Sequence, residues 1–191
     1  MIASLGSSVG SLTDIIIKRV VAGFSTLPTV NDWLNTIALL LVYAVIALPI
    51  GLGLNFLQFD WQLARKTVIK IVVSSLIAPA ILEELLFRVI LIPQPLANRD
   101  FSTILIWSAI ASFLFIIYHP LNALTLFPAG RETFFNPVFL FLAALLGVIC
   151  TISYLQSGSI WSPVVIHWVT VVIWLLCLGG VNKLQVTQSN I

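Results

Sequence analysis

Two adjacent glutamates, Glu83 and Glu84, lie in the middle of a long apolar stretch, and Arg88 follows four residues after Glu84. Placing an ionised side chain at bilayer depth costs at least about 2.5–3.5 kcal/mol of insertion free energy. Three charges so close together therefore indicate a structural or functional role. Residues four apart share a helix face, which predicts an ion pair between Glu84 and Arg88. Glu83 is turned by about 100° from Glu84 and can point at something else. The pattern therefore predicts one structural and one reactive carboxylate.

The composition predicts an integral membrane protein. Of the 191 residues, 60% are apolar and only 8% are charged, whereas a soluble domain carries about 25% charged residues. The formal net charge is only +2, and no basic run extends beyond Arg65-Lys66. This charge pattern excludes a nucleic-acid partner, because such proteins carry clustered positive charge. The expected surroundings are the lipid bilayer.

Apolar windows of about 20 residues pick out the candidate membrane spans. They cover residues 35–57, 69–92, 102–119, 137–156 and 160–178. Residues 14–24 are apolar around Lys18 and Arg19 but too short to span, which favours an interfacial helix. The predicted fold is all-α and multi-pass. An N-terminal interfacial segment, 1–34, precedes a membrane domain, 35–191, with a bundle of about five transmembrane helices.

The chain has two histidines, and both fall on predicted spans. His119 closes the third span and His167 lies within the fifth, so a bundle can bring both histidines to Glu83 and Glu84 around a polar cavity. In such a cavity a carboxylate can take a proton from water and make it a nucleophile. One histidine can hold that water and another can stabilise a developing oxyanion. These are the parts needed to hydrolyse an amide without a covalent intermediate.

Three motifs in this order resemble a known family. Glu-Glu-x-x-x-Arg at 83–88, Phe-x-x-x-His at 115–119 and the later His167 are similar to the motifs of the CPBP family. That family comprises CAAX prenyl endopeptidases, bacteriocin-processing proteins and related intramembrane proteases. The resemblance covers about residues 70–175, and its most specific part is the first motif within a membrane helix. It implies a glutamic intramembrane protease of CAAX type that acts on a peptide or protein substrate at the membrane.

The resemblance also implies a role for each site residue. Glu83 would be the base that activates water, and His119 would help to position that water. Glu84 and Arg88 would brace the site, in agreement with their helical spacing. His167 would contribute to the oxyanion hole. No cofactor and no metal are implied.

One position departs from the family pattern. The family usually carries asparagine or a similar polar residue four positions after the third motif's histidine, and this chain has Val171 there. Thr170 and Asn122 are candidate substitutes for the missing donor. The departure bears on catalytic competence more than on the fold. It favours a second hypothesis, in which a non-catalytic membrane protein of the same fold binds or protects a partner.

A zinc-dependent membrane protease is the third hypothesis. One carboxylate and two histidines, here Glu83, His119 and His167, match a catalytic zinc site in ligand type. The sequence has no His-Glu-x-x-His, the spacing that would place two ligands on one helix. The zinc hypothesis therefore ranks below the metal-independent one.

Overall fold

The computed structural model describes residues 2–61, 65–95 and 100–185, and these residues form helices and no strand. The helices in chain order are α1 (Ile2–Ser25), α2 (Val30–Gly53), α3 (Arg65–Ser75), η1 (Leu76–Ile81), α4 (Leu82–Glu84), η2 (Leu85–Ile90), α5 (Phe101–Leu124), η3 (Pro128–Gly130), α6 (Arg131–Phe134), α7 (Pro137–Ser157), α8 (Trp161–Cys177) and α9 (Gly180–Gln185). The all-α prediction is confirmed. Of these helices, α2, α5 and α7 are long and apolar enough to cross a membrane, and α8 is a shorter apolar helix.

Local sequence signals explain where the long helices begin and end. Thr29 starts α2 with a capping box, because its hydroxyl accepts from the Asp32 N–H while the Asp32 carboxylate accepts from the Thr29 N–H. Asn136 caps α7 with its side-chain Oδ1, which accepts from the N–H groups of Val138 and Phe139, and Pro137 stands at the first helical position. Gly158 ends α7 with a φ of 64°, a left-handed conformation that suits glycine.

The predicted spans need correction at three places. The first starts at Val30 and ends at Gly53 rather than covering 35–57. The second is not one continuous helix: η1 breaks at Ala78, whose φ of −131° and ψ of 115° are extended, as is common before a proline. The third continues through Pro120 to Leu124, so that His119 lies inside the helix and not at its end.

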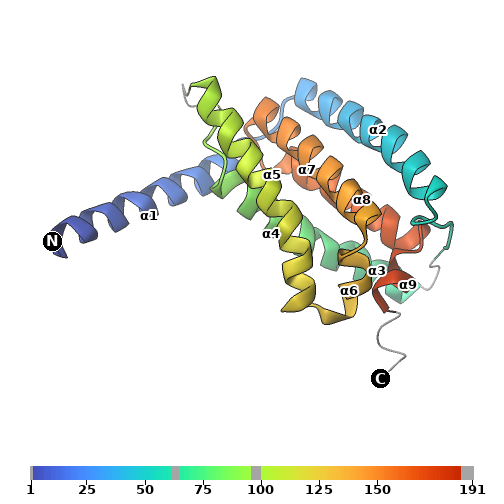
Figure 1. Ribbon diagram of the computed structural model, residues 1–191. Coiled ribbons are helices and arrows are strands. Elements are labelled where there is room, and N and C mark those ends of the chain that lie inside the picture. The colour runs from blue at the N-terminus through green and yellow to red at the C-terminus, as the bar shows by residue number, and fades with distance from the viewer. Residues whose placement is uncertain (1, 62–64, 96–99, 186–191) are drawn as a thin grey trace.

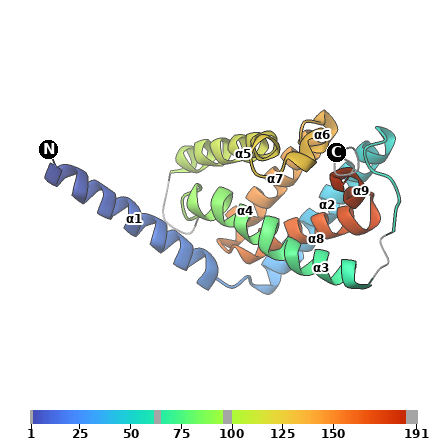
Figure 2. The same cartoon turned by 90° about the horizontal axis from the view of Figure 1, so that it is seen from below.

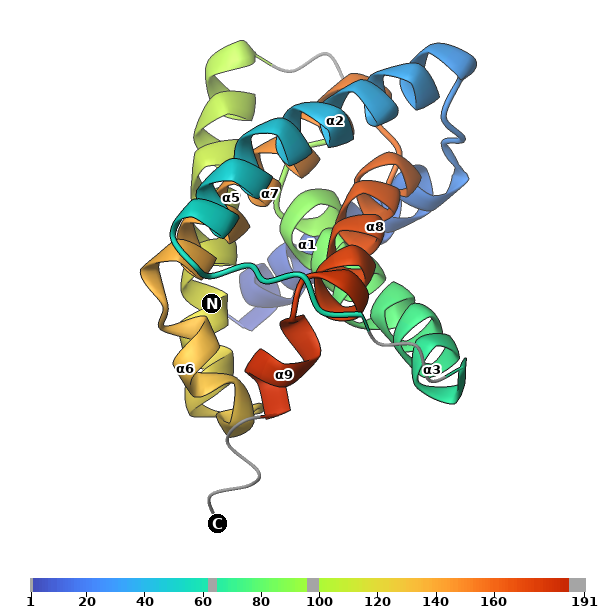
Figure 3. The same ribbon diagram turned by 90° about the vertical axis from the view of Figure 1, so that its right-hand side faces the viewer.

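Helix α7 lies at the centre of the bundle and packs against α2, α5 and α8. Seen from below, the line of helices from α3 to η2 crosses beneath α7 and α8 (Figure 2). In Figure 3, α2 crosses in front of α7, α5 lies to the left, and α9 and α6 are close together at one end of the bundle. Phenylalanine side chains from several helices fill the centre, and these are Phe56, Phe87, Phe115 and Phe139.

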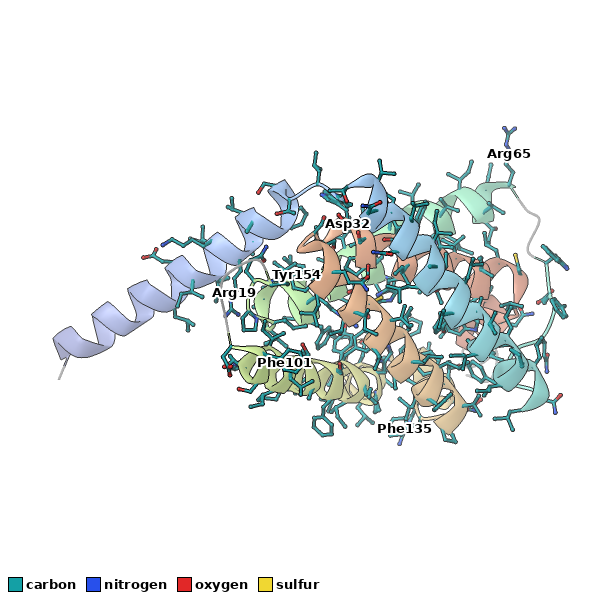
Figure 4. All side chains as sticks on the ribbon, turned by 90° about the horizontal axis from the view of Figure 1, so that it is seen from above. Arg19, Asp32, Arg65, Phe101, Phe135 and Tyr154 are labelled. Carbon is teal, nitrogen blue, oxygen red and sulfur yellow. The ribbon has the colours of Figure 1, made fainter. Side chains whose placement is uncertain are left out.

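Helix α1 projects from the bundle and is joined to it near its C-terminal end (Figures 1 and 2). Arg19 donates from Nη1 to the carbonyl of Ile90 at 2.6 Å, so its charge lies at the end of η2. Trp161 donates from Nε1 to the carbonyl of Phe24 at 3.1 Å. In Figure 4, Arg19 and Tyr154 mark this junction. The helix is longer than the predicted 14–24, because it begins at Ile2.

Candidate active site

The ion pair predicted between Glu84 and Arg88 is present and fully buried. Arg88 Nε lies 3.1 Å from Glu84 Oε2, and Arg88 Nη1 donates to Glu84 Oε1 at 3.2 Å. Glu84 is 0% exposed and Arg88 only 1%. Two charges so deeply buried need further hydrogen bonds to be stable. Both groups find such bonds on other helices.

Arg88 reaches α7 and α5 with the rest of its guanidinium group. Nη2 donates to the carbonyl of Gly147 on α7 at 3.0 Å, and Cζ lies 4.5 Å from the ring centre of Phe115 on α5. A Cβ atom at Gly147 would lie 3.1 Å from the Phe115 ring and 3.4 Å from Arg88 Nη2. A glycine at position 147 therefore lets the α7 backbone approach the arginine closely.

His167 on α8 joins the same network and connects the two glutamates. Its Nδ1 lies 2.7 Å from Glu84 Oε1 and its Nε2 lies 3.8 Å from Glu83 Oε2. Because Glu84 is paired with Arg88, its carboxylate accepts the hydrogen bond and Nδ1 donates it. Helical spacing predicts Arg88 as the partner of Glu84, and the structure adds His167 as a second partner.

His119 is held by its own helix and by aromatic rings. Its Nδ1 donates to the carbonyl of Phe115 at 2.9 Å, since a carbonyl oxygen only accepts. The rings of Phe115, Phe134 and Phe139 pack edge-on against the imidazole, with centroids 4.9 to 5.7 Å away. These contacts fix the ring plane and leave Nε2 of the neutral imidazole with its lone pair.

A cavity of about 1220 Å³ brings the candidate residues from three helices together. Its wall includes Glu83, His119, Asn122, His167, Thr170 and Val171. Most of the remaining wall is apolar, and the exposed Lys66 and Lys70 of α3 also line it. Glu84 and Arg88 are not part of the wall, so they lie behind the cavity and Glu83 lies on it.

The two glutamates therefore differ in their surroundings. The Glu83 side chain is 11% exposed and that of Glu84 is 0% exposed. Oε2 of each glutamate lacks a hydrogen-bond partner among the described residues, but that of Glu84 is ion-paired with Arg88 at 3.1 Å. A carboxylate that lines a cavity and has spare acceptor capacity can bind a water molecule there and take its proton.

Two contributors to this site were missed in the sequence. The carbonyl of Gly147 is a backbone group, and no side-chain motif marks it. Its only signal is a glycine inside the apolar run of α7, which can indicate a close approach. Trp174 also lines the cavity, its indole N–H has no partner among the described residues, and no motif in the sequence marks it.

The chain is all-α, has apolar helices of membrane length, and carries a buried cluster of acids and histidines at a cavity. These features are typical of intramembrane enzymes. The model of one family, described as type II CAAX prenyl endopeptidase Rce1-like, matches residues 65–173. This match covers more than half of the 191 residues, so the chain belongs to the Rce1-like family. The resemblance to the CPBP family is thereby confirmed. Neither the curated proteins nor the solved structures contain a match.

Proposed function

We propose that this protein is a multi-pass intramembrane endopeptidase of CAAX type that hydrolyses a peptide bond near the membrane surface with water activated by Glu83. The difference between the two glutamates carries this proposal. Each glutamate has one oxygen without a hydrogen-bond partner in the described structure, but Glu84 is paired with Arg88 and His167 and lies off the cavity wall, whereas Glu83 lines the cavity. A base must be able to reach the water that it binds and deprotonates.

In the proposed reaction the Glu83 carboxylate takes one proton from water as the water oxygen attacks the carbonyl carbon of the substrate. The carbonyl oxygen becomes an oxyanion, and His167 is the proposed hydrogen-bond donor to it. His119 accepts from the water at Nε2. Glu83 then returns the proton to the amide nitrogen, the C–N bond breaks, and a carboxylic acid and an amine are released.

The geometry supports a metal-independent reaction over a zinc-dependent one. Among the residues that the structure describes, no three His, Cys, Asp or Glu side chains are grouped so that they could hold one metal ion. Nδ1 of His119 is engaged by a backbone carbonyl and Nδ1 of His167 by Glu84, so that only the Nε2 atoms are left as possible metal ligands. The case against zinc therefore rests on the absence of such a grouping in the described part of the chain.

The membrane setting follows from the apolar helices and the family. We place α2, α5, α7 and α8 in the bilayer together with the segmented helix from α3 to η2. The apolar side chains of α1, including Ile15 and Ile17 beside Lys18, suit a helix that lies at the interface. The expected partners are the lipid bilayer and a peptide or protein substrate within it.

A non-catalytic membrane protein of the same fold is the second candidate function. Val171 favours it, because the residue lines the cavity next to His167 and offers no hydrogen-bond donor. Such a protein would keep the cavity and bind a partner in it without hydrolysis.

The test is cleavage of a prenylated CAAX peptide by the purified protein in detergent, with and without a strong chelator. We expect cleavage in both conditions and none by Glu83→Gln. Activity that is lost with chelator and restored by zinc would establish the zinc mechanism instead. Peptide binding without any cleavage would establish the non-catalytic function.

A further inference from the structure

Three residues of α8 form a polar row along the cavity wall. His167, Thr170 and Trp174 all line the cavity, and their spacing of three and then four residues places them on one face of the helix. Each carries a hydrogen-bond donor. The row starts at His167, which faces Glu83, and continues away from it toward the C-terminal end of α8.

The hydroxyl of Thr170 differs from other helical hydroxyls in this protein. Thr36 and Thr151 each donate to the carbonyl four residues earlier, at 2.7 and 2.8 Å, as buried hydroxyls in helices usually do. Thr170 Oγ1 is buried and has no hydrogen-bond partner within the described chain. Ser108 and Ser162 share this property, but neither lines the cavity. Thr170 thus combines an unpartnered hydroxyl with a position on the cavity wall.

The indole of Trp174 repeats this pattern one turn further along α8. Trp161 and Trp168 on the same helix each donate from Nε1 to a backbone carbonyl, at 3.1 and 2.8 Å. Trp174 Nε1 is buried without a partner in the described structure, although the ring itself is held between Phe56 and Phe139, with centroid distances of 6.4 and 5.8 Å. A buried donor is usually paired, so an unpaired one on a cavity wall suits a ligand acceptor.

We infer that Thr170 and Trp174 donate hydrogen bonds to two backbone carbonyls of a substrate peptide bound in an extended conformation along α8. Four residues of helix rise about 6 Å, and alternate residues of an extended chain, whose carbonyls point to the same side, are about 6.6–6.8 Å apart. The spacing of the two donors therefore matches that of the two acceptors. A peptide bound along this row has its scissile bond at the His167 end, next to Glu83. This assignment rests on the proposed function, because it takes a peptide as the substrate.

The test measures the affinity of a prenylated CAAX peptide for the full chain in detergent, in a Glu83→Gln background that removes cleavage. Thr170→Val keeps the shape of the side chain and removes the hydroxyl, and Trp174→Phe keeps a ring and removes the N–H. Each is expected to raise Kd about 3–10-fold, the loss of one hydrogen bond. Thr170→Ser keeps the hydroxyl and should keep the Kd. In the active protein both substitutions should raise KM and change kcat less.

Two matched variants separate this role from a structural one. Thr36→Val and Trp161→Phe remove a hydroxyl and an indole N–H that are already bonded to backbone carbonyls away from the cavity. They should lower the melting temperature and leave the peptide Kd unchanged. Thr170→Val should do the reverse, because it removes an unpaired polar atom from the interior.

Equal peptide affinity in the Glu83→Gln parent, Thr170→Val and Trp174→Phe, with all three folded, would overturn the inference whatever the cleavage assay gives. Weaker binding by both variants, in a protein whose wild type binds the peptide but never cleaves it, would support the inference and overturn the proposed endopeptidase function. The two failures are therefore distinguishable.

Discussion

The polar groups behind the cavity and those on its wall differ in their hydrogen bonds and ion pairs. Behind the cavity, Glu84, Arg88, the carbonyl of Gly147 and Nδ1 of His167 form an ion-paired network, with contacts of 2.7 to 3.2 Å that link α4, η2, α7 and α8. Glu84 Oε2 has no hydrogen-bond partner among the described residues, but it is ion-paired with Arg88. On the wall, single polar atoms of Glu83, Thr170 and Trp174 are buried without a hydrogen-bond partner among the described residues. The two regions share His167, whose ring touches both.

This difference indicates which groups hold the structure and which meet the substrate. A buried charge is strongly destabilising unless it is paired, so the network behind the cavity must stay intact for the helices to pack. An unpaired polar atom costs free energy in the empty site, and binding can recover it when a ligand supplies the missing partner. Substitutions behind the cavity should therefore act mainly on stability, and those on its wall mainly on activity.

The largest expected effect is the loss of activity in Glu83→Gln. Removing a general base typically lowers the rate about 10²–10⁴-fold, and the amide is nearly isosteric with the carboxylate, so the fold should be kept. Peptide cleavage and the melting temperature of the same purified sample measure the two effects. Cleavage by Glu83→Gln at the wild-type rate would show that another group is the base.

Glu84→Ala, unlike Glu83→Gln, should cause a large loss of stability. Arg88 would remain buried without its carboxylate, and His167 would lose the acceptor at Nδ1. Breaking one side of a buried ion pair costs about 3–5 kcal/mol, which unfolding in detergent with added denaturant can measure. Activity should fall as well, because His167 is no longer oriented. Glu132→Ala, at an exposed position on α6, is the control and should leave the free energy of unfolding nearly unchanged.

Much of the helix placement could be predicted from hydropathy and end signals. The span expected at 137–156 is observed as Pro137–Ser157, and that at 160–178 as Trp161–Cys177. Their ends are marked by local chemistry, Pro137 and Gly158 above all. The extension of α5 through Pro120 was not predicted, because a proline usually marks a helix boundary and here the helix continues. Only packing in the fold determines such a continuation.

The candidate site was predictable where it depends on helical spacing and not where it depends on tertiary contact. The Glu84–Arg88 pair follows from four residues along one helix. The bond from His167 to Glu84 joins residues 83 positions apart, and the contact of Arg88 with Gly147 joins residues 59 apart. Periodicity cannot reveal such contacts. The assignment of His167 to an oxyanion hole, with Val171 as the defect beside it, stays a prediction.

Val171→Asn tests that prediction on the cavity wall. Position 171 lies one turn after His167 and lines the cavity, so an amide there can donate to the same oxyanion. One oxyanion donor is worth up to about 10²–10³ in rate, and we expect part of this gain in kcat because the new amide also needs partners of its own. Val171→Ala should leave the rate unchanged.

An unchanged rate in a folded Val171→Asn protein would point to a donor already in place. Thr170→Val and Asn122→Ala then decide between the two cavity residues that could supply it. A fall in kcat identifies the donor, whereas a rise in KM alone agrees with the peptide-binding role inferred for Thr170. No change in kcat in either variant would exclude the oxyanion arrangement.

The smallest expected effect is that of Gly147→Ala, which adds one methyl group where the two regions meet. The new Cβ would lie 3.1 Å from the Phe115 ring, which must move by a few tenths of an ångström, and 3.4 Å from Arg88 Nη2, which is an ordinary contact. Overpacking of this kind costs about 1–3 kcal/mol, and the gain in helix propensity from glycine to alanine offsets about 0.5–1 kcal/mol of it. The expected net loss in the free energy of unfolding is about 1 kcal/mol.

Gly53→Ala is the matched control, because no atom of the described residues outside its own helical turn lies within 4 Å of the added Cβ. It should leave stability unchanged or raise it slightly. Denaturant unfolding of both variants gives the two free energies. The rate should fall modestly in Gly147→Ala and stay constant in Gly53→Ala, since a displaced Phe115 ring changes its contacts with Arg88 and His119. A Gly147→Ala protein as stable and as active as Gly53→Ala would show that the network behind the cavity does not need the close approach of α7 to Arg88.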